Sequence, residues 1–361
     1  MKKFISRREA LRWMALTATA FLVACQNIVR PTPNTDQAEP PSPTSTHLPE
    51  PTATPQSTET SQPKILQQTK VQEMVDPALV YMTKDINADG LMKIYSALGN
   101  KAHGKVAVKI SSGEPGGHHF LLPDLIAPLV KEVNGTIVEC NTAYGGGRAD
   151  TASHLRVMED HGFSAIAPVD IMDADGSTNL PITGGIHLNE DVVGSHFTDY
   201  DFVVNLAHFK GHAMGGFGGV IKNMSIGIAS STGKSLIHSA GKETTGFGYG
   251  TPQDDFLESM AEAAKGIADY MGENILYINV MNNLSVDCDC DGYPAAPTMM
   301  DIGILGSLDP VALNQACVDL VYAAPDGKDL ITRMESRNGI HTLEHAEAIG
   351  LGNRKYELVN I

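Results

Sequence analysis

The stretch KVAVKISSGEPGGHHFLLPDLIAPLVKEVNGTIVEC, residues 105–140, decides the fold class of this chain. It opens with a short apolar run at 106–110, which has the length and composition of a buried strand. An amphipathic segment at 121–133 predicts a helix, and a second apolar run at 136–140 predicts another strand. A strand, a helix and a further strand in this order are typical of parallel sheets, because parallel strands need a long crossover connection.

The same alternation continues through the rest of the chain. Further strands are predicted at 202–206, 276–280 and 302–305, and further helices at 151–161, 253–271 and 310–323. Thr251-Pro252 and Asp309-Pro310 each place a capping oxygen before a proline at the first position of a helix. We therefore predict an α/β domain over residues 66–361, with a largely parallel sheet flanked by helices. In such folds ligands bind in the loops beyond the carboxyl ends of the strands.

The N-terminus has the three parts of an export signal. Lys2, Lys3, Arg7 and Arg8 form a basic segment, an apolar run at 13–24 comes next, and Cys25 lies directly after it. The apolar run is shorter than the ~20 residues that cross a bilayer, so residues 1–25 predict a removable signal. Residues 6–8 resemble a twin-arginine signal and residues 22–25 resemble a lipobox, which implies cleavage before Cys25 and acylation of its thiol. The alternative is an ordinary secretory signal with a chance arginine pair.

The linker at 26–65 differs in composition from the globular part of the chain. Nine of the 20 prolines lie between Pro31 and Pro63, among Thr, Ser, Gln and Glu. Such a segment buries too little apolar surface to offset its chain entropy, so we predict a disordered stalk. Together with a lipid on Cys25, it would hold the globular domain outside the cytoplasm, at the surface of the cell membrane.

The charge of the chain excludes one class of partner. The 26 Lys and Arg face 42 Asp and Glu, a formal net charge of −16, and there is no basic run after the N-terminus. Nucleic-acid binding requires clustered cations that neutralise phosphates, so we predict no nucleic-acid partner.

Two glycine-containing loops come after the first two predicted strands. In the first, Glu114, His118 and His119 supply acid/base or ligating groups beside glycines that let the backbone approach a ligand. The alternative is a polar turn in which the glycines serve geometry alone.

The second loop is Tyr144-Gly145-Gly146-Gly147-Arg148. Backbone N–H groups of Gly145, Gly146 and Gly147, together with the Arg148 guanidinium, suit a small anion. The spacing of a P-loop is absent. The alternative is a flexible turn in which Arg148 pairs with a local carboxylate such as Asp150.

The segment from His208 to Asn223 carries the densest chemistry in the chain. Lys210, His212, Lys222 and Asn223 are separated by glycines that include Gly216, Gly218 and Gly219. We interpret this as backbone that curls around a ligand. Lys222 comes directly after an apolar pair, so its amine is expected to be partly desolvated and nucleophilic, and His238 lies a little further on. The alternative is a mobile surface loop with solvated Lys and His side chains.

Four cysteines remain after Cys25. Cys288 and Cys290 lie two residues apart, which is too close for an easy disulfide between them, and their spacing suits a soft metal or an iron–sulfur centre. Cys317 lies on the apolar face of a predicted helix and is expected to be buried. Three interpretations stay open for Cys288 and Cys290: metal ligands, disulfides to Cys140 or Cys317, and inert loop thiols.

The chain resembles the domain-of-unknown-function 362 family (DUF362) from about Lys105 to Asp319. The matching segments are 106–109 with Gly113-Glu114, 144–148, 210–212 with Lys222-Asn223, 287–290, 301–303 and 307–312. Members of this family are commonly described as iron–sulfur proteins, and many carry an inserted ferredoxin segment. This sequence lacks that insert, so the resemblance implies at most a centre held by Cys288 and Cys290.

The segment from His212 to Lys222 is also distantly similar to the histidine–glycine-rich–lysine segment of nickel-pincer lactate racemases. By position, that resemblance implies that Lys222 tethers the cofactor covalently, His238 ligates nickel and His212 acts as an acid/base group. The second acid/base histidine of the racemases has no clear counterpart, and His118 and His119 are the candidates for it.

Three functional hypotheses remain. The first is an exported, lipid-anchored, cofactor- or metal-dependent protein with redox or isomerase chemistry on a small oxyacid, in which Arg148 holds the anion. The second is an iron–sulfur or metal-binding redox protein that uses Cys288 and Cys290. The third is a lipoprotein that binds a small anionic solute without chemistry. The sequence names no substrate, metal or protein partner.

Overall fold

A computed structural model describes residues 76–361. The predicted signal segment with Cys25, and the predicted linker at 26–65, lie outside the described residues. None of the helices within 76–361 is both long enough and apolar enough to cross a membrane.

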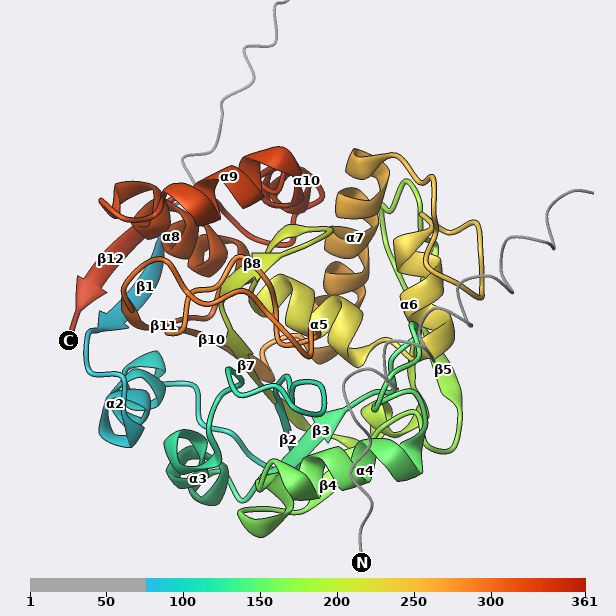
Figure 1. Cartoon of the computed structure of the whole chain (residues 1–361), viewed down its shortest axis with the longest axis horizontal. Coiled ribbons are helices and arrows are strands. Elements are labelled where there is room, and N and C mark those ends of the chain that lie inside the picture. Colours follow the sequence, from blue (N-terminus) through green and yellow to red (C-terminus); the bar gives the residue numbers. More distant parts are fainter. Residues whose placement is uncertain (1–75) are drawn as a thin grey trace, which may run out of the picture. The chain divides into compact units, whose positions relative to one another are not determined.

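Eight strands form the central sheet (Figure 1). In spatial order they are β12 (Tyr356–Asn360), β1 (Ala78–Thr83), β11 (Gly303–Ser307), β10 (Ile275–Met281), β7 (Phe202–His208), β2 (Val106–Lys109), β3 (Thr136–Glu139) and β4 (Val169–Ile171). Strand β11 runs antiparallel to both of its neighbours, and all other pairings in this sheet are parallel. The predicted α/β fold with a largely parallel sheet is confirmed.

Both faces of the sheet are covered, because successive side chains on a strand point to opposite faces. In β10, Leu276, Ile278 and Val280 pack with helices α2 (Ala88–Leu98) and α3 (Pro123–Glu132). The intervening Ile275 and Tyr277 pack in a second core with helices on the other side. The central strands therefore carry apolar side chains on both faces, as is typical of strands buried on both sides.

The remaining helices are α4 (Thr151–Asp160), α5 (Val220–Ile228), α6 (Ser231–His238), α7 (Gln253–Met271), α8 (Pro310–Ala323), α9 (Lys328–Ser336) and α10 (His341–Ala348). Two 3₁₀ turns cover Phe163–Ala165 and Ser195–Asp199. Two antiparallel ribbons lie outside the main sheet: β5 (Ser177–Pro181) with β6 (Glu190–Gly194), and β8 (Lys210–His212) with β9 (Gly216–Gly218).

One of the two predicted helix caps is confirmed. The Asp309 carboxylate accepts hydrogen bonds from the backbone N–H groups of Val311 (2.8 Å) and Ala312 (2.9 Å), and Pro310 is the first residue of α8. The predicted cap at Thr251 is wrong. Helix α7 begins at Gln253, so Pro252 rather than Thr251 flanks it, and no side chain caps it.

Candidate functional site

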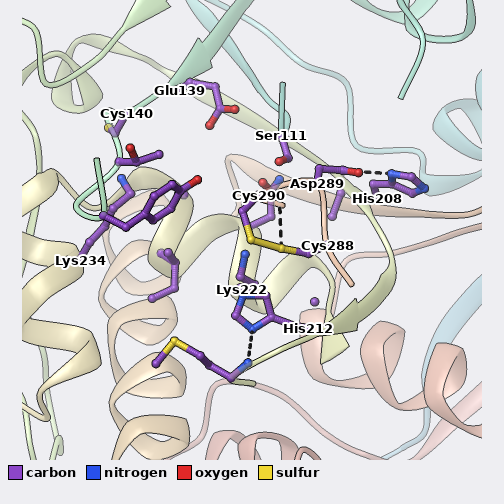
Figure 2. A pocket seen from close by; sticks show the side chains of 18 of the residues that line it. Ser111, Glu139, Cys140, His208, His212, Lys222, Lys234, Cys288, Asp289 and Cys290 are labelled. Atoms are coloured by element: carbon purple, nitrogen blue, oxygen red, sulfur yellow. Dashed lines mark hydrogen bonds and ion pairs between the residues drawn. A yellow bond between two sulfur atoms is a disulfide. The ribbon is translucent and has the colours of Figure 1, made fainter. Parts of the chain in front are cut away.

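A cavity of about 240 Å³ lies beyond the carboxyl ends of β2, β3 and β7 (Figure 2). Its wall includes residues from the ends of these strands, from the β8–β9 ribbon, from helices α5 and α6, and from the loop after β10. This is where the topology predicts a ligand, since the loops beyond the ends of parallel strands meet at one edge of the sheet.

Lys222 lies in the first turn of α5 and lines the cavity. Its stem lies against the backbone of Gly218, where a Cβ would come within 3.2 Å of the Lys222 Cδ. Within residues 76–361 its amino group has no hydrogen-bond or ion-pair partner. Burial, together with the nearby charges of Arg148 and Lys109, lowers the pKa of Lys222 to about 8. The amine is therefore partly neutral near physiological pH, as a nucleophile requires.

His212 and His238 line the same cavity in opposite neutral tautomers. The Nδ1 of His212 accepts the backbone N–H of Gly215 at 2.9 Å, so a neutral ring carries its proton on Nε2. The Nδ1 of His238 lies 2.6 Å from the carbonyl oxygen of Lys234, to which it must donate, so its Nε2 is unprotonated. Burial lowers the pKa of His212 well below the usual value and that of His238 to about 4. One ring thus offers a donor and the other an acceptor.

A buried ion cluster forms the wall on the β2 and β3 side. The Lys109 ammonium lies 3.0 Å from the Glu139 carboxylate, and Arg148 lies 3.3 Å from Glu139 and 2.9 Å from Glu114. Burial alone would raise the pKa of Glu139, but the charges of Lys109 and Arg148 hold that pKa at about 2. Tyr144 donates its hydroxyl to Glu114 at 2.5 Å. Glu139 is therefore ionised at neutral pH and is held in place by two cations.

A second ion pair lies beside the cysteine loop. Asp289 contacts the ring of His208 at 3.0 Å (Figure 2). It also contacts the ammonium of Lys210 at 2.6 Å. Burial alone would raise the pKa of Asp289, but both partners hold it at about 2. The charge of Lys210 is therefore matched within the protein.

Cys288 and Cys290 are joined by a disulfide, against the expectation that two-residue spacing would disfavour one. The alternative of disulfides to Cys140 or Cys317 is excluded, because both of these thiols are free and buried. A His212 ring nitrogen lies within 4.8 Å of both sulfurs, which makes these three residues a candidate metal-ligand group. The donor set suits a soft or borderline cation once the disulfide is reduced to thiolates.

The family of the chain is shown by its sequence. Residues 106–319, more than half of the chain, match the family described as "Domain of unknown function (DUF362)". The chain belongs to this family. No curated protein matches it.

Two solved structures are distantly similar to this DUF362 chain. The lactate racemase apoprotein from Thermoanaerobacterium thermosaccharolyticum is 15% identical, with a TM-score of 0.38 over 67% of this chain and 56% of that one. A structural-genomics crystal structure of a Thermotoga maritima protein is 12% identical, with a TM-score of 0.39 over 64% of this chain and 57% of that one. The matched regions thus cover 56% and 57% of the lengths of these two solved proteins.

Several residues predicted for the site of the DUF362 chain do meet in the cavity wall. They are Arg148, Lys210, His212, Gly218, Gly219, Lys222, Asn223, His238, Cys288 and Cys290. The prediction that Lys222 is desolvated agrees with its lowered pKa.

Other predicted residues lie elsewhere or have other partners. The side chain of His118 does not line the cavity, and neither does Gly216. Gly145, Gly146 and Gly147 also lie outside the cavity wall. The N–H of Gly147 points to Glu114 (3.3 Å), which Arg148 also binds, so the anion at this loop is an internal carboxylate. The alternative partner Asp150 instead caps α4 by accepting the N–H of Ser153.

The glycines after His208 lie mostly in an ordered ribbon rather than in an irregular loop. Residues 210–218 form the β8–β9 ribbon, and α5 begins directly after Gly219. Glycine is needed there for close packing, since a Cβ on Gly211 would lie 2.3 Å from the Val286 carbonyl oxygen. A Cβ on Gly219 would lie 2.5 Å from the Asn314 side chain.

Sequence reasoning missed Lys109, Glu139, Cys140 and Lys234, which also line the cavity. The first two carried a signal that could have found them. Each is the last residue of an apolar strand, where a charged side chain has to find a buried partner. Lys234 and Cys140 carried no comparable signal.

Proposed function

We propose that this DUF362 chain is a metal- or cofactor-dependent protein that performs redox or isomerase chemistry on a small oxyacid in the cavity described above. The observation that carries the proposal is the Lys222 amine, which lines the cavity without a partner among the described residues. Lys222 is half-buried, and a partly desolvated amine without a partner costs free energy unless it has a function or a ligand.

Each of the three residues has a separate task in this proposal. Lys222 either forms an ion pair with an acidic group of the substrate or, as the racemase resemblance implies, is bonded covalently to a cofactor. His238 accepts a proton, or ligates a metal, through its unprotonated Nε2. His212 donates the proton on its own Nε2, so the two rings can move a proton in one direction without first exchanging tautomers.

The residues fit a metal-containing cofactor in one respect. Neutral imidazole with a free Nε2 is a common metal ligand, and His238 offers that atom because its Nδ1 is held by the Lys234 carbonyl. A bound nickel-pincer-type group would supply the hydride acceptor for an oxyacid.

The test compares Lys222→Met with Lys93→Met in the full chain, purified without oxygen from its native host. Lys93 lies on α2 and its amine pairs with Asp85 in an exposed position, which makes it a matched control. Turnover is measured as interconversion of 2-hydroxy acid enantiomers and as formation of 2-oxo acids. We expect Lys222→Met to lower turnover about 100-fold, the usual scale for loss of one charged group in a site, and Lys93→Met to leave it unchanged. Full turnover by the Lys222→Met protein would sink the proposal.

A second function is favoured by the grouping of His212 with Cys288 and Cys290. In this case the chain is a redox protein that holds iron–sulfur or another metal on these thiolates after the disulfide is reduced. Visible absorbance of anaerobic protein that disappears in Cys288→Ser but persists in Cys317→Ser would support it. Saturable binding of oxyacids with no turnover in any preparation would instead favour the solute-binding lipoprotein.

We also propose that the protein is exported and anchored to the cell membrane through Cys25. The support is the order of basic, apolar and cysteine-containing segments in residues 1–25. Release of a Cys25→Ser protein from the membrane fraction is the corresponding test.

A further inference from the structure

Five cationic side chains line the cavity: Lys109, Arg148, Lys210, Lys222 and Lys234. Three of them are matched by carboxylates within the protein. Lys109 pairs with Glu139 at 3.0 Å, Arg148 with Glu114 at 2.9 Å and Lys210 with Asp289 at 2.6 Å. Among the described residues, Lys222 and Lys234 have no ion-pair partner.

Lys234 is a buried lysine that the proposed function does not use. It lies on α6 with 6% of its surface exposed, and its ammonium donates a hydrogen bond to the backbone carbonyl of Ala229. This neutral carbonyl is the only hydrogen-bond partner of the Lys234 ammonium among the described residues.

Two nearby acidic residues form no ion pair with Lys234. Asp173 uses its oxygens to accept the N–H groups of Asn141 (2.8 Å) and Ser231 (3.3 Å) and forms no ion pair with Lys234. Asp191 is buried, and burial raises its pKa to about 8, so it is mostly uncharged at neutral pH. Lys234 therefore has no ion-pair partner among the described residues, and its side chain lines the cavity.

The positive charge is local to this cavity. The whole chain carries a net charge of −16, so the cations here do not reflect a basic surface. Lys222 and Lys234 lie on successive helices, α5 and α6, and line one continuous cavity. Because isolated buried charges are costly, the ligand that best fits supplies one negative charge to each.

We propose that the oxyacid has two separate acidic groups, one bound at Lys222 and one at Lys234. This inference rests on the proposed function and adds the substrate class to it. A monocarboxylate would leave one of the two ammonium groups unmatched. A dicarboxylate and an acid that carries a phosphate share the required chemistry, and the experiment separates them.

The experiment measures binding to the full chain by isothermal titration calorimetry with matched pairs of probes. Lactate is compared with malate, butyrate with succinate, and glycolate with phosphoglycolate. We expect the doubly charged member of at least one pair to bind more than about 10-fold more tightly, since each desolvated charge pair is worth at least one power of ten in affinity. A preference confined to malate and succinate identifies a dicarboxylate, and one confined to phosphoglycolate identifies a phosphate-bearing acid.

Lys234→Gln is the deciding variant. It should reduce the affinity for the doubly charged probe to that of the singly charged one, and leave the singly charged probe unchanged. Lys234→Arg should keep the preference, and thermal unfolding of both variants shows whether each is folded. If Lys234→Gln does not fold, the affinities of Lys234→Arg and of the unmodified protein still show whether the doubly charged probes bind more tightly.

Two results would overturn the inference, and only one of them would also overturn the proposed oxyacid site. Equal affinities within every pair, with both probes weakened by Lys222→Gln, would refute the second acidic group and leave the proposed oxyacid site standing. Absence of binding by every probe would refute both.

Discussion

His238 is held in one protonation state by its neighbours. Its Nδ1 donates to the carbonyl of Lys234, and its ring packs against Phe256 at 5.0 Å between centroids and against Phe247 at 4.6 Å. Burial among these groups disfavours the imidazolium and lowers the pKa of His238 to about 4. A ring in this state can ligate a metal at neutral pH, and it accepts a proton only where a bound anion stabilises the imidazolium.

Neutral His238 makes the folded chain sensitive to acid. Between pH 6.5, the ordinary pKa of histidine, and pH 4, the unfolded chain binds a proton at His238 that the folded chain does not. The stability that neutral His238 contributes is therefore present above pH 6.5 and lost as the pH falls toward 4. We expect a loss of about 3 kcal/mol in the free energy of unfolding from this group.

Urea unfolding at pH 7 and at pH 4.5 checks the prediction. His238→Gln should lose less stability between these two pH values than the unmodified protein. His103→Gln, at an exposed position, is the control and should behave like the unmodified protein. Identical acid dependence in all three proteins would show that the ring is not held neutral.

At the residue scale, sequence predicted the groups whose chemistry is unusual in itself. Lys222, His212, His238 and the two cysteines were found because such side chains are uncommon beside glycines and apolar residues. The ion pairs of the cavity wall were not predicted, because Arg148 pairs with Glu114, 34 residues back, rather than with a local carboxylate. A partner that the fold brings from a distance leaves no trace in the local pattern.

At the scale of elements, the start of α8 depends on one carboxylate. Asp309 accepts the N–H groups of Val311 and Ala312 and also that of Asn353 at 2.8 Å, which ties the helix to the segment before β12. Helix α7 has no such side-chain cap. The two helix starts look alike in sequence but differ in what supports them.

Asp309→Ala should lower the free energy of unfolding by about 1–2 kcal/mol, the usual effect of losing an N-cap. Thr251→Ala should change it by less than about 0.5 kcal/mol, because that side chain caps nothing and surface changes are usually small. Chemical denaturation of the two variants at neutral pH makes the comparison. Equal destabilisation would contradict the assignment of the caps.

The elements that sequence predicted are those whose apolar runs are continuous. The central strands and helices α3, α4, α7 and α8 were found, with ends displaced by at most two residues. The β8–β9 ribbon and helices α5 and α6 were missed because their glycines satisfy close contacts with distant residues. Gly211, for instance, packs on the carbonyl of Val286, which lies far along the sequence. The density of glycines pointed to the segment 208–223, which contributes to the cavity wall, but it did not show that these glycines allow close packing.

At the scale of the whole molecule, an acidic chain encloses a cavity whose unmatched charges are positive. A small anion bound there would be selected by the cavity itself, since the net charge of −16 does not attract anions from a distance. The parallel strands bring Lys109 and Glu139 to the same edge as the α5 and α6 helices. Only in the folded chain do these segments form one site.

The most direct test of the central claim is the metal content of the full chain, purified without oxygen from its native host. We predict a stoichiometric metal ion in the chain, retained in His103→Ala and lost in His238→Ala, because His238 offers the free ring nitrogen in the cavity. Protein without metal, or metal that His238→Ala retains in full, would contradict a metal-dependent site in this cavity.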